Sequence, residues 1–274
     1  MLLCQYNASH ARNKITIIFM KKLILILPFL TLLLSGCFWE EEKKRESITK
    51  GWSPKTFFNQ AKEQASTRST DKAIELFEQL QAAYPGSKYA LQSKLEIAYA
   101  LYKSEDYDQS IDRLNSYIKL YPNHFSTAYA YYLRGVVSED KSRSILDDYI
   151  TDSAQRDVNS VRDAFNYYLA LIDKFPKTEY AEEAKSRLII LRNILSRHEL
   201  FVAIFYTNKG ANIAAIGRTK YIIEKYPNTP SVPAALHLMA HNYDVIDADT
   251  LAKDARRVLK NSYPLYTPHY SLED

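Results

Sequence analysis

Two histidines lie at a spacing suited to holding a metal ion, and no motif for catalysis accompanies them. His237 and His241 are four residues apart, which places both on one face of a helix. A zinc protease of the HExxH type carries its catalytic glutamate directly after the first histidine, and this chain has Leu238 there. The sequence also lacks a Gly-x-Ser-x-Gly, phosphate-loop or paired-carboxylate motif. We therefore predict no metal site, no cofactor and no enzymatic activity, and interpret both histidines as polar residues flanking a helix.

Cys37 is the residue whose surroundings specify a chemical modification. Lys21 and Lys22 precede a 12-residue apolar run, Leu23 to Leu34, and the small residues Ser35-Gly36 lead to the cysteine. A basic region, an apolar region and a small-residue cleavage zone are the layout of a secretory signal. Twelve helical residues rise only about 18 Å, which is too short for a hydrocarbon core of about 30 Å. The run is therefore interpreted as a signal peptide and not as a membrane span.

The segment Leu34-Ser35-Gly36-Cys37 resembles the lipobox of bacterial lipoproteins. This resemblance implies transfer of a diacylglyceryl group to the Cys37 sulfur, cleavage before Cys37 and N-acylation, and three acyl chains suffice for stable anchoring. Phe38 follows in place of the aspartate that retains enteric lipoproteins in the inner membrane. We therefore expect a lipid-anchored protein at the periplasmic face of the outer membrane of a Gram-negative bacterium. The alternative is an ordinary signal peptide with a chance cysteine.

These features divide the chain into four predicted parts. They are a signal peptide (1–36), a lipidated flexible tether (37–52), a repeat domain (53–264) and a tail (265–274). Met20 by itself begins a complete signal, so we expect translation to start there; the alternative is a longer basic region starting at Met1. The charged run Glu40 to Glu46 fits a solvated tether.

Charge and composition exclude several classes of protein. The formal net charge of +4 comes from four basic residues before Cys37, and from there onward 32 basic residues equal 32 acidic ones. A neutral body gives no electrostatic argument for binding nucleic acid. Only 6 glycines in 274 residues argue against β-sandwiches, barrels and dinucleotide folds, and 2 cysteines cannot build a disulfide scaffold.

Five aromatic-proline pairs organise the rest of the chain. They are Tyr84-Pro85, Tyr121-Pro122, Phe175-Pro176, Tyr226-Pro227 and Tyr263-Pro264. Each follows an apolar run with helical spacing, and proline ends a helix. Small residues lie 12 and 24 positions before these prolines, with one gap in the third repeat: Ala61, Ala73, Ala98, Ser110, Ala164, Ala203, Ala215, Ala240 and Ala252. This is the signature of tetratricopeptide (TPR) repeats, so we predict an all-α fold, a right-handed α-solenoid of about five TPR repeats and ten helices.

The spacing of the prolines locates two insertions. Successive prolines are 37, 54, 51 and 37 residues apart. The spacing of 54 exceeds 37 by 17 residues, and these extra residues lie in the polar segment 140–159. We therefore expect a long loop in the middle repeat (123–176). The N-terminal repeats (53–122) precede this repeat, and the C-terminal repeats (177–264) follow it. The spacing of 51 exceeds 37 by 14 residues, which is nearly four helical turns, and no Gly or Pro interrupts residues 178–209. We therefore predict a single helix there, about 45 Å long.

A lipobox followed by five TPR repeats resembles the BamD family, the TPR lipoproteins of the β-barrel assembly machinery (BAM complex) of the outer membrane. The resemblance covers about residues 37–260 and rests on three blocks: Tyr132-Leu133-Arg134-Gly135, Gln155-Arg156-Asp157 with Arg162 and Ala164, and Phe205 to Ala211 with Ala214 and Arg218. The chain departs from the family at Lys209, where Arg is usual, and at Val158, where Pro is usual.

The resemblance implies a non-enzymatic adaptor. Its C-terminal repeats would dock on the last POTRA domain of BamA together with other BAM lipoproteins, and its N-terminal repeats would receive unfolded outer-membrane β-barrel proteins. Arg218 matches the family arginine that pairs with a POTRA carboxylate, and Lys209 belongs to the same block. Arg218 also lies near the start of a predicted helix, where the helix dipole disfavours a cation. A carboxylate of a partner protein would offset this unfavourable interaction. Tyr99 and Tyr102 are the candidates for a substrate groove, and helical phase does not say which of them faces inward.

Two other functions share part of this pattern. A pilotin that guides secretin assembly would share the lipobox and the TPR spacing, but it would not explain the block from Phe205 to Arg218. A regulator or enzyme of cell-wall synthesis would need a catalytic domain or a sugar cleft, and the sequence has no segment left over for one.

Overall fold

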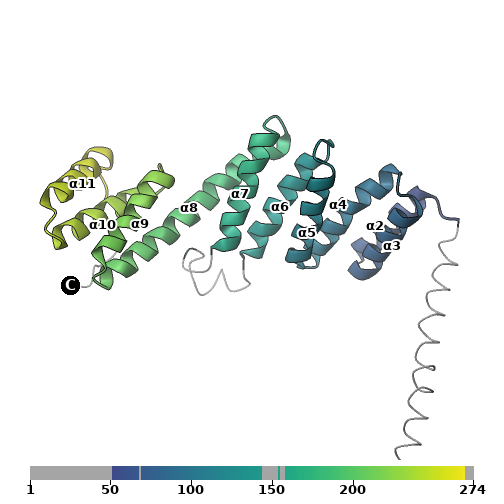
Figure 1. Ribbon diagram of the computed structural model, residues 1–274, viewed down its shortest axis with the longest axis horizontal. Helices are drawn as coiled ribbons and strands as arrows, with labels where there is room; N and C mark the ends of the chain where they lie inside the picture. Colours follow the sequence, from purple (N-terminus) through teal and green to yellow (C-terminus); the bar gives the residue numbers. More distant parts are fainter. Residues whose placement is uncertain (1–50, 68, 144–153, 155–157, 269–274) are drawn as a thin grey trace, which may run out of the picture. The chain divides into compact units, whose positions relative to one another are not determined.

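The computed structural model describes residues 51–67, 69–143, 154 and 158–268, and these residues form ten helices and no strand (Figure 1). The helices are α2 (Pro54–Ser66), α3 (Thr70–Ala83), α4 (Lys88–Lys103), α5 (Tyr107–Leu120), α6 (Thr127–Lys141), α7 (Asn159–Lys174), α8 (Glu179–Asn208), α9 (Asn212–Lys225), α10 (Val232–Val245) and α11 (Asp249–Ser262). The predicted all-α fold with ten helices is thus confirmed. The predicted signal peptide and Cys37 lie outside the described residues.

The chain divides into two compact units, residues 1–57 and 58–274. In the described part of the first unit, the Trp52 ring packs edge-on against Phe57, with ring centroids 5.2 Å apart. The second unit contains the remainder of α2 and all the other helices described. The boundaries predicted at residues 36, 52 and 264 stay predictions.

The helices of the second unit are arranged as successive pairs. From α3 to α11 each helix packs against the next one along the chain, and the first helices of the pairs also pack in turn, α4 on α6, α6 on α8 and α8 on α10. Helix α2 joins the series through Phe58, whose ring lies 5.8 Å from Phe77 of α3 and 5.5 Å from Tyr89 of α4. Each pair thus buries its apolar face against its neighbours, as the repeat pattern predicts.

The small residues of the repeat signature lie where the two helices of a pair meet. All nine are buried, none more than 2% exposed: Ala61, Ala73, Ala98, Ser110, Ala164, Ala203, Ala215, Ala240 and Ala252. In the third pair Gly135 of α6 occupies the missing position. A Cβ atom on Gly135 would lie 2.4 Å from Cε1 of Tyr168 in α7. The third pair therefore keeps the close approach, with glycine as its small residue.

Local residues set the ends of the helices. The aromatic residue of every aromatic-proline pair directly follows the last residue of α3, α5, α7, α9 or α11, as predicted. Three residues in the turns between the two helices of a pair have a positive φ: Glu105, Gly210 and Asp247. Each lies five positions before the small residue of the second helix of its pair. Only Gly210 adopts this left-handed conformation without steric cost, and the other two are acidic residues in the same tight turn.

The long helix and the end of the array also follow from sequence. Helix α8 runs for 30 residues without interruption, which confirms the helix predicted for 178–209. On α11, the last helix, Lys253, Arg256 and Lys260 are exposed. The equivalent positions of α5 hold Ile111, Leu114 and Ile118, which pack in the core. A charged outer face on the last helix ends the stacking of repeats.

Candidate functional site

An apolar groove of about 670 Å³ lies along the N-terminal repeats of the second unit. Leu91, Leu95 and Tyr99 project from one face of α4 at intervals of four residues, which is the spacing of neighbours on a helix surface. The other lining residues are Lys62, Lys88, Gln92, Glu96, Tyr117, His124, Phe125, Ser126, Tyr129 and Tyr180. The groove is thus built by α2, α4, α5, α6 and α8, together with the turn before α6.

Aromatic rings form much of the groove wall. Phe125 is 87% exposed and Tyr99 is 42% exposed. The Tyr129 and Tyr180 rings pack 5.7 Å apart, and burial, followed by the nearby Glu96, raises the pKa of Tyr129 to about 12. The side chains of Lys62 and Glu96 form an ion pair of 3.2 Å within the lining. An apolar surface with a few polar groups is the usual character of a ligand groove.

The structure separates the two tyrosines proposed for this groove. Tyr99 lines it, whereas Tyr102 is absent from its described lining. The Tyr102 hydroxyl instead donates a 2.5 Å hydrogen bond to the Asp140 carboxylate of α6, and its ring packs 5.9 Å from that of Tyr99. Burial and this hydrogen bond raise the pKa of Tyr102. Tyr102 therefore holds α4 against α6, beside the groove.

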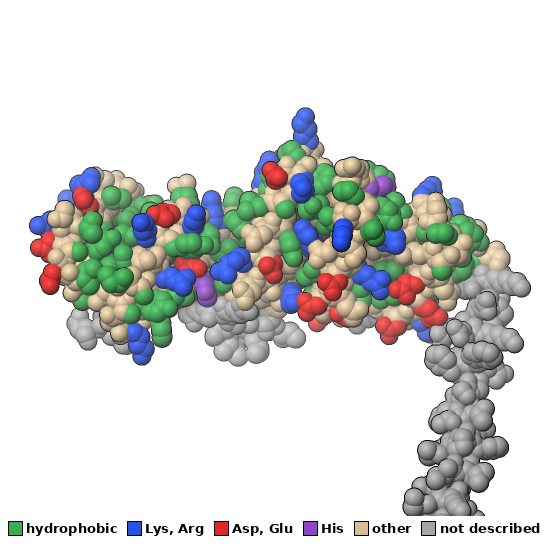
Figure 2. Space-filling model, viewed as in Figure 1, with side chains coloured by type: hydrophobic (Ala, Val, Ile, Leu, Met, Phe, Trp, Pro, Cys, Tyr) green, Lys and Arg blue, Asp and Glu red, His purple; other side chains and the backbone are tan. Residues whose placement is uncertain are grey.

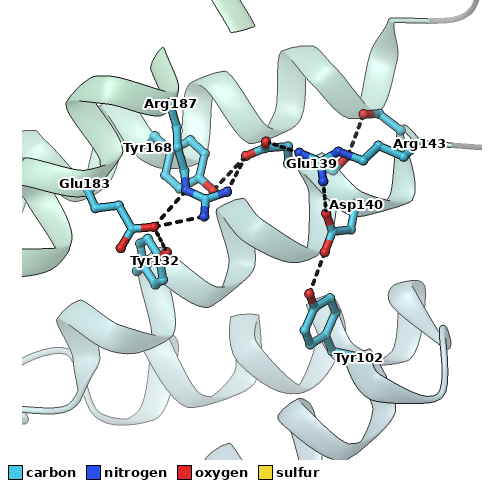
Figure 3. A network of polar contacts seen from close by, with 9 residues as sticks. Tyr102, Tyr132, Glu139, Asp140, Arg143, Tyr168, Glu183 and Arg187 are labelled. Carbon is cyan, nitrogen blue, oxygen red and sulfur yellow. Dashed lines mark hydrogen bonds and ion pairs between the residues drawn. The ribbon is translucent and has the colours of Figure 1, made fainter. Parts of the chain in front are cut away.

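A buried carboxylate connects the third and fourth helix pairs (Figure 3). Glu139 of α6 is 7% exposed. Its carboxylate accepts hydrogen bonds from Arg187 of α8 at 2.9 Å, from Arg143 at 2.8 Å and from the Tyr168 hydroxyl of α7 at 3.2 Å. Burial, and next the charge of Glu139, raises the pKa of Tyr168. Because two arginines and a hydroxyl satisfy this carboxylate, the buried charge is compensated.

The same network reaches the wall of the groove. Arg187 also donates to Glu183 at 2.9 Å, and Glu183 accepts a short hydrogen bond from the Tyr132 hydroxyl. The Tyr132 ring lies 5.4 Å from that of Tyr180, one of the lining residues. The charged network of Figure 3 therefore supports the side of the groove that α6 and α8 form.

Arg218 contacts a carboxylate of its own chain. Its Nη1 donates a 2.9 Å hydrogen bond to Oε2 of Glu199 in α8. Arg218 is the seventh residue of α9, beyond the first turn, so the helix dipole does not reach it and that part of the sequence argument was wrong. Whether Arg218 also contacts another protein stays a prediction.

Lys209 lies in the turn between α8 and α9, where it follows the last residue of α8. Its Nζ is 5.9 Å from the centroid of the Phe205 ring. Phe205 is 57% exposed and Ile213, at the start of α9, is 70% exposed. This turn therefore presents a cation beside one exposed aromatic ring, and a further exposed apolar side chain follows four residues after Lys209.

The two histidines singled out at first have other neighbours. The His237 ring lies 6.2 Å from that of Tyr266, and burial, with smaller effects of His241 and Arg256, lowers the pKa of His237. Within the part of the chain that the structure describes, no three His, Cys, Asp or Glu side chains are grouped to hold a metal ion. Over the same part, no helix is long and apolar enough to cross a membrane.

Glu139 and Glu199 are the functional candidates that sequence reasoning missed. Each belongs to a buried stripe of residues at intervals of four: Glu139 ends the stripe of Tyr131 and Gly135 in α6, and Glu199 lies within the stripe of Leu191, Leu195 and Ala203 in α8. An acidic residue within such a stripe was the signal available, because charged residues are almost never buried unless paired.

These features define a class. Paired helices with small residues at every crossing, stacked in series, form a helical repeat protein of the TPR type, and its apolar groove and exposed turns are suited to binding other polypeptides.

The chain belongs to the YfiO family of outer membrane lipoproteins, whose model matches residues 51–259. It is 34% identical to the outer membrane protein assembly factor BamD of Neisseria gonorrhoeae over 247 residues, 89% of this chain and 92% of that protein. The BamD of Xylella fastidiosa (strain Temecula1) is 30% identical over 243 residues, 88% of this chain and 82% of that one. Among solved structures, the TPR2AB domain of yeast Sti1 is similar at 11% identity over 78% of each chain, with a TM-score of 0.39.

Proposed function

We propose that this protein is a non-catalytic, lipid-anchored adaptor of outer-membrane β-barrel assembly. The observation that carries the proposal is its similarity, along 89% of the chain, to proteins named as outer membrane protein assembly factors. Its repeat fold supports the same role, because stacked helix pairs offer extended surfaces for several partners. The relatives named above favour this role over that of a pilotin.

The groove of the N-terminal repeats receives unfolded outer-membrane proteins. Its apolar wall, with Tyr99, Phe125, Tyr129 and Tyr180, suits aromatic and aliphatic side chains of an unfolded chain. Lys88 adds positive charge to the lining, since the charge of Lys62 is paired with that of Glu96, and this suits a C-terminal carboxylate of such a chain. Tyr102 lies outside the groove lining, and its hydrogen bond to Asp140 stabilises the packing of α4 on α6 and does not contact the bound chain.

The C-terminal repeats dock on the last POTRA domain of BamA, with other BAM lipoproteins bound beside them. Arg218 and Lys209 are the proposed contact residues; the exposed Phe205 ring lies beside Lys209, and the exposed Ile213 follows at the start of α9. Hydrophobic side chains also gather over α10 and α11, at the left of Figure 2. Among the residues of these two helices, Val245, Leu251 and Val258 are 41–54% exposed. Apolar side chains next to cations suit a protein interface.

The lipid on Cys37 anchors the protein to the periplasmic face of the outer membrane. Two further observables follow from this anchor. Mass spectrometry of the purified protein should give the mass of a chain that begins at Cys37 and carries three acyl chains. A Cys37→Ser variant should leave the outer-membrane fraction.

Affinity capture tests the adaptor role. The tagged, acylated protein is recovered from detergent-solubilised envelopes, and BamA is expected to co-purify with it. The Cys37→Ser variant is the matched control, because it lacks the sulfur that receives the lipid and should still keep the interaction in detergent. Recovery of a secretin without BamA would contradict the proposal and would identify the protein as a pilotin.

A further inference from the structure

A small cavity of about 70 Å³ lies between α3, α4 and α5, apart from the groove. Lys94 and Ile97 line it from α4, on a different side of that helix from the groove-lining stripe that begins at Leu91. The cavity has room for a few water molecules or for one small polar group. Its other lining residues are Gln81, Arg113, Ser116, Tyr117 and Leu120.

Among the described residues, two cations and no carboxylate line this cavity. Nζ of Lys94 donates a 2.9 Å hydrogen bond to Oε1 of Gln81. Nη2 of Arg113 pairs at 3.0 Å with Glu78, which lies outside the lining. Lys94, Arg113 and Glu78 together carry one net positive charge. An ammonium has three N–H donors and a guanidinium has five, so both cations keep donors for a ligand.

The Gln81 amide that holds Lys94 is itself fixed. Its Nε2 donates a 3.0 Å hydrogen bond to Oγ of Ser93, a fully buried residue of α4. The Ser93 hydroxyl in turn donates to the carbonyl of Ala90 at 2.8 Å. This chain of hydrogen bonds keeps the Lys94 ammonium at the cavity wall.

The fourth helix pair shows what the same two repeat positions do elsewhere. Lys94 lies four residues before the small residue of α4, and Arg113 lies three residues after that of α5. In α8 and α9 these positions are Glu199 and Arg218, which form a hydrogen bond of 2.9 Å. There the chain supplies a carboxylate for its arginine from the position that Lys94 occupies in the second pair.

The third pair also fills the space between these positions. In α6 and α7 they are Tyr131 and Tyr167, and Cζ of Arg134 lies 5.0 Å and 3.9 Å from the centroids of their rings. In the second pair the positions hold two like charges, which repel each other, and both line a cavity. The second pair therefore lacks the complementary group that the chain itself provides in the third and fourth pairs.

We propose that this cavity receives one aspartate or glutamate side chain of another protein, held between Lys94 and Arg113. One carboxylate neutralises the net charge, and its two oxygens match the planar donors of a guanidinium. The inference goes beyond the proposed function, because it adds an interaction surface apart from both the groove and the C-terminal repeats.

The apolar part of the lining favours a protein over a free anion. Leu120 is 64% exposed, whereas Ile97 and Tyr117 are buried. A small anion would leave Leu120 in water. A polypeptide covers this side chain while it places a carboxylate on the cations, as in the apolar centre and charged contacts of a protein interface.

Zero-length cross-linking tests the contact directly. A carbodiimide joins a carboxylate and an amine that touch, forming an amide with loss of water. It is added to the assembly captured in detergent through the full-length acylated protein, and the links are located by mass spectrometry. We expect an amide between Nζ of Lys94 and an Asp or Glu side chain of another protein, whose identity the linked peptide gives.

The Lys185–Glu182 ion pair is the internal control, because its 2.7 Å contact should be linked in every sample. If this pair is linked and Lys94 is not, the proposal is wrong. A link from Lys94 to a chain-terminal carboxylate, or only to this chain or a second copy of it, would also overturn the proposal. Recovery of BamA in the same sample would then leave the adaptor role standing without the cavity.

Binding of the purified linked protein tests the two cations and the space between them. Lys94→Gln and Arg113→Gln should each weaken binding by at least about fivefold. Ser116→Phe fills the mouth of the cavity from an exposed position without changing the charge, and should weaken binding as much. Unchanged affinity in these three variants would overturn the proposal.

Two further variants separate a specific contact from a general effect of charge. Lys94→Arg keeps the charge but has no amine, so the cross-link should disappear while the affinity stays within about threefold. Lys185→Gln removes an exposed lysine that already has a carboxylate partner, and should leave the affinity within about twofold. A loss with Lys185→Gln as large as that with Lys94→Gln would mean that net charge alone governs binding, and would overturn the cavity as the site.

Discussion

Gly135 of α6 lies directly against the ring of Tyr168 in α7, so closely that a Cβ atom would come within 2.4–2.7 Å of three ring atoms. Tyr168 is fully buried and its hydroxyl donates to Glu139, one helical turn after Gly135. The ring is thus held by the glycine on one side and by the carboxylate at its hydroxyl end. This contact takes the place of the alanine or serine that brings the helices together in the other pairs.

Gly135→Ala should therefore destabilise the protein. The new methyl group must displace a buried ring, which costs more than the helix propensity gained, and we expect the free energy of unfolding to fall by about 1–2 kcal/mol. Urea denaturation followed by circular dichroism measures this. Gly217→Ala is the control: this glycine is also helical, in α9, and a Cβ there meets nothing within 4 Å. The control should gain up to about 1 kcal/mol, and equal effects of both substitutions would contradict the close contact.

Gly135 also shows how far the sequence alone could go. The nine other small positions are predictable because helix length and turn length are constant, so small residues recur 12 positions apart. In the third repeat the insertion between α6 and α7 places Gly135 29 residues before Ala164, which is 12 plus the 17 extra residues of that repeat. Correcting the spacing for the insertion would have found it. Helix α8 was predictable for the opposite reason, because nothing interrupts its pattern.

The polar contacts were not predictable in the same way. Glu199 and Arg218 are 19 residues apart on consecutive helices, and their pairing depends on how α8 and α9 rotate against each other. Tyr99 and Tyr102 lie three residues apart on nearly the same side of α4, and the packing of α6 decides that one lines the groove while the other bonds to Asp140. Helical periodicity locates a buried face but does not select partners across it.

Glu139→Gln should weaken the junction of α6, α7 and α8. The substitution removes a buried charge and leaves Arg187 and Arg143 without their shared carboxylate, so we expect a loss of about 2 kcal/mol or more in the free energy of unfolding. Thermal or urea denaturation measures it. Glu182→Gln removes an exposed partner of Lys185 on α8 and should change stability by no more than about 0.5 kcal/mol. A neutral result for Glu139→Gln would mean that the network does not stabilise the junction.

Glu183 should make stability depend on acid pH. The hydrogen bond from Tyr132, and next that from Arg187, hold the pKa of Glu183 below its ordinary 4.5. Below pH 4.5 the unfolded chain therefore binds a proton that the folded chain does not, so stability falls as the pH falls toward the lower folded value. Between pH 5.5 and pH 3.5, the wild-type protein should lose more stability than Glu183→Gln loses. Identical curves for the wild-type protein and Glu183→Gln would contradict this effect.

The groove can be tested by separating its lining from its support. Tyr99→Ser and Phe125→Ser each remove an exposed ring, so we expect binding of a urea-unfolded outer-membrane protein, measured by fluorescence anisotropy on dilution, to weaken about five- to tenfold at unchanged thermal stability. Tyr102→Phe keeps its ring but loses the hydrogen bond to the Asp140 carboxylate, which should lower stability by about 1–2 kcal/mol and leave the affinity unchanged. If Tyr102→Phe weakened binding while Tyr99→Ser and Phe125→Ser did not, the unfolded chain would bind elsewhere. If Tyr99→Ser and Phe125→Ser weaken binding at unchanged stability while Tyr102→Phe keeps the wild-type affinity, the unfolded chain binds to the exposed rings of the groove.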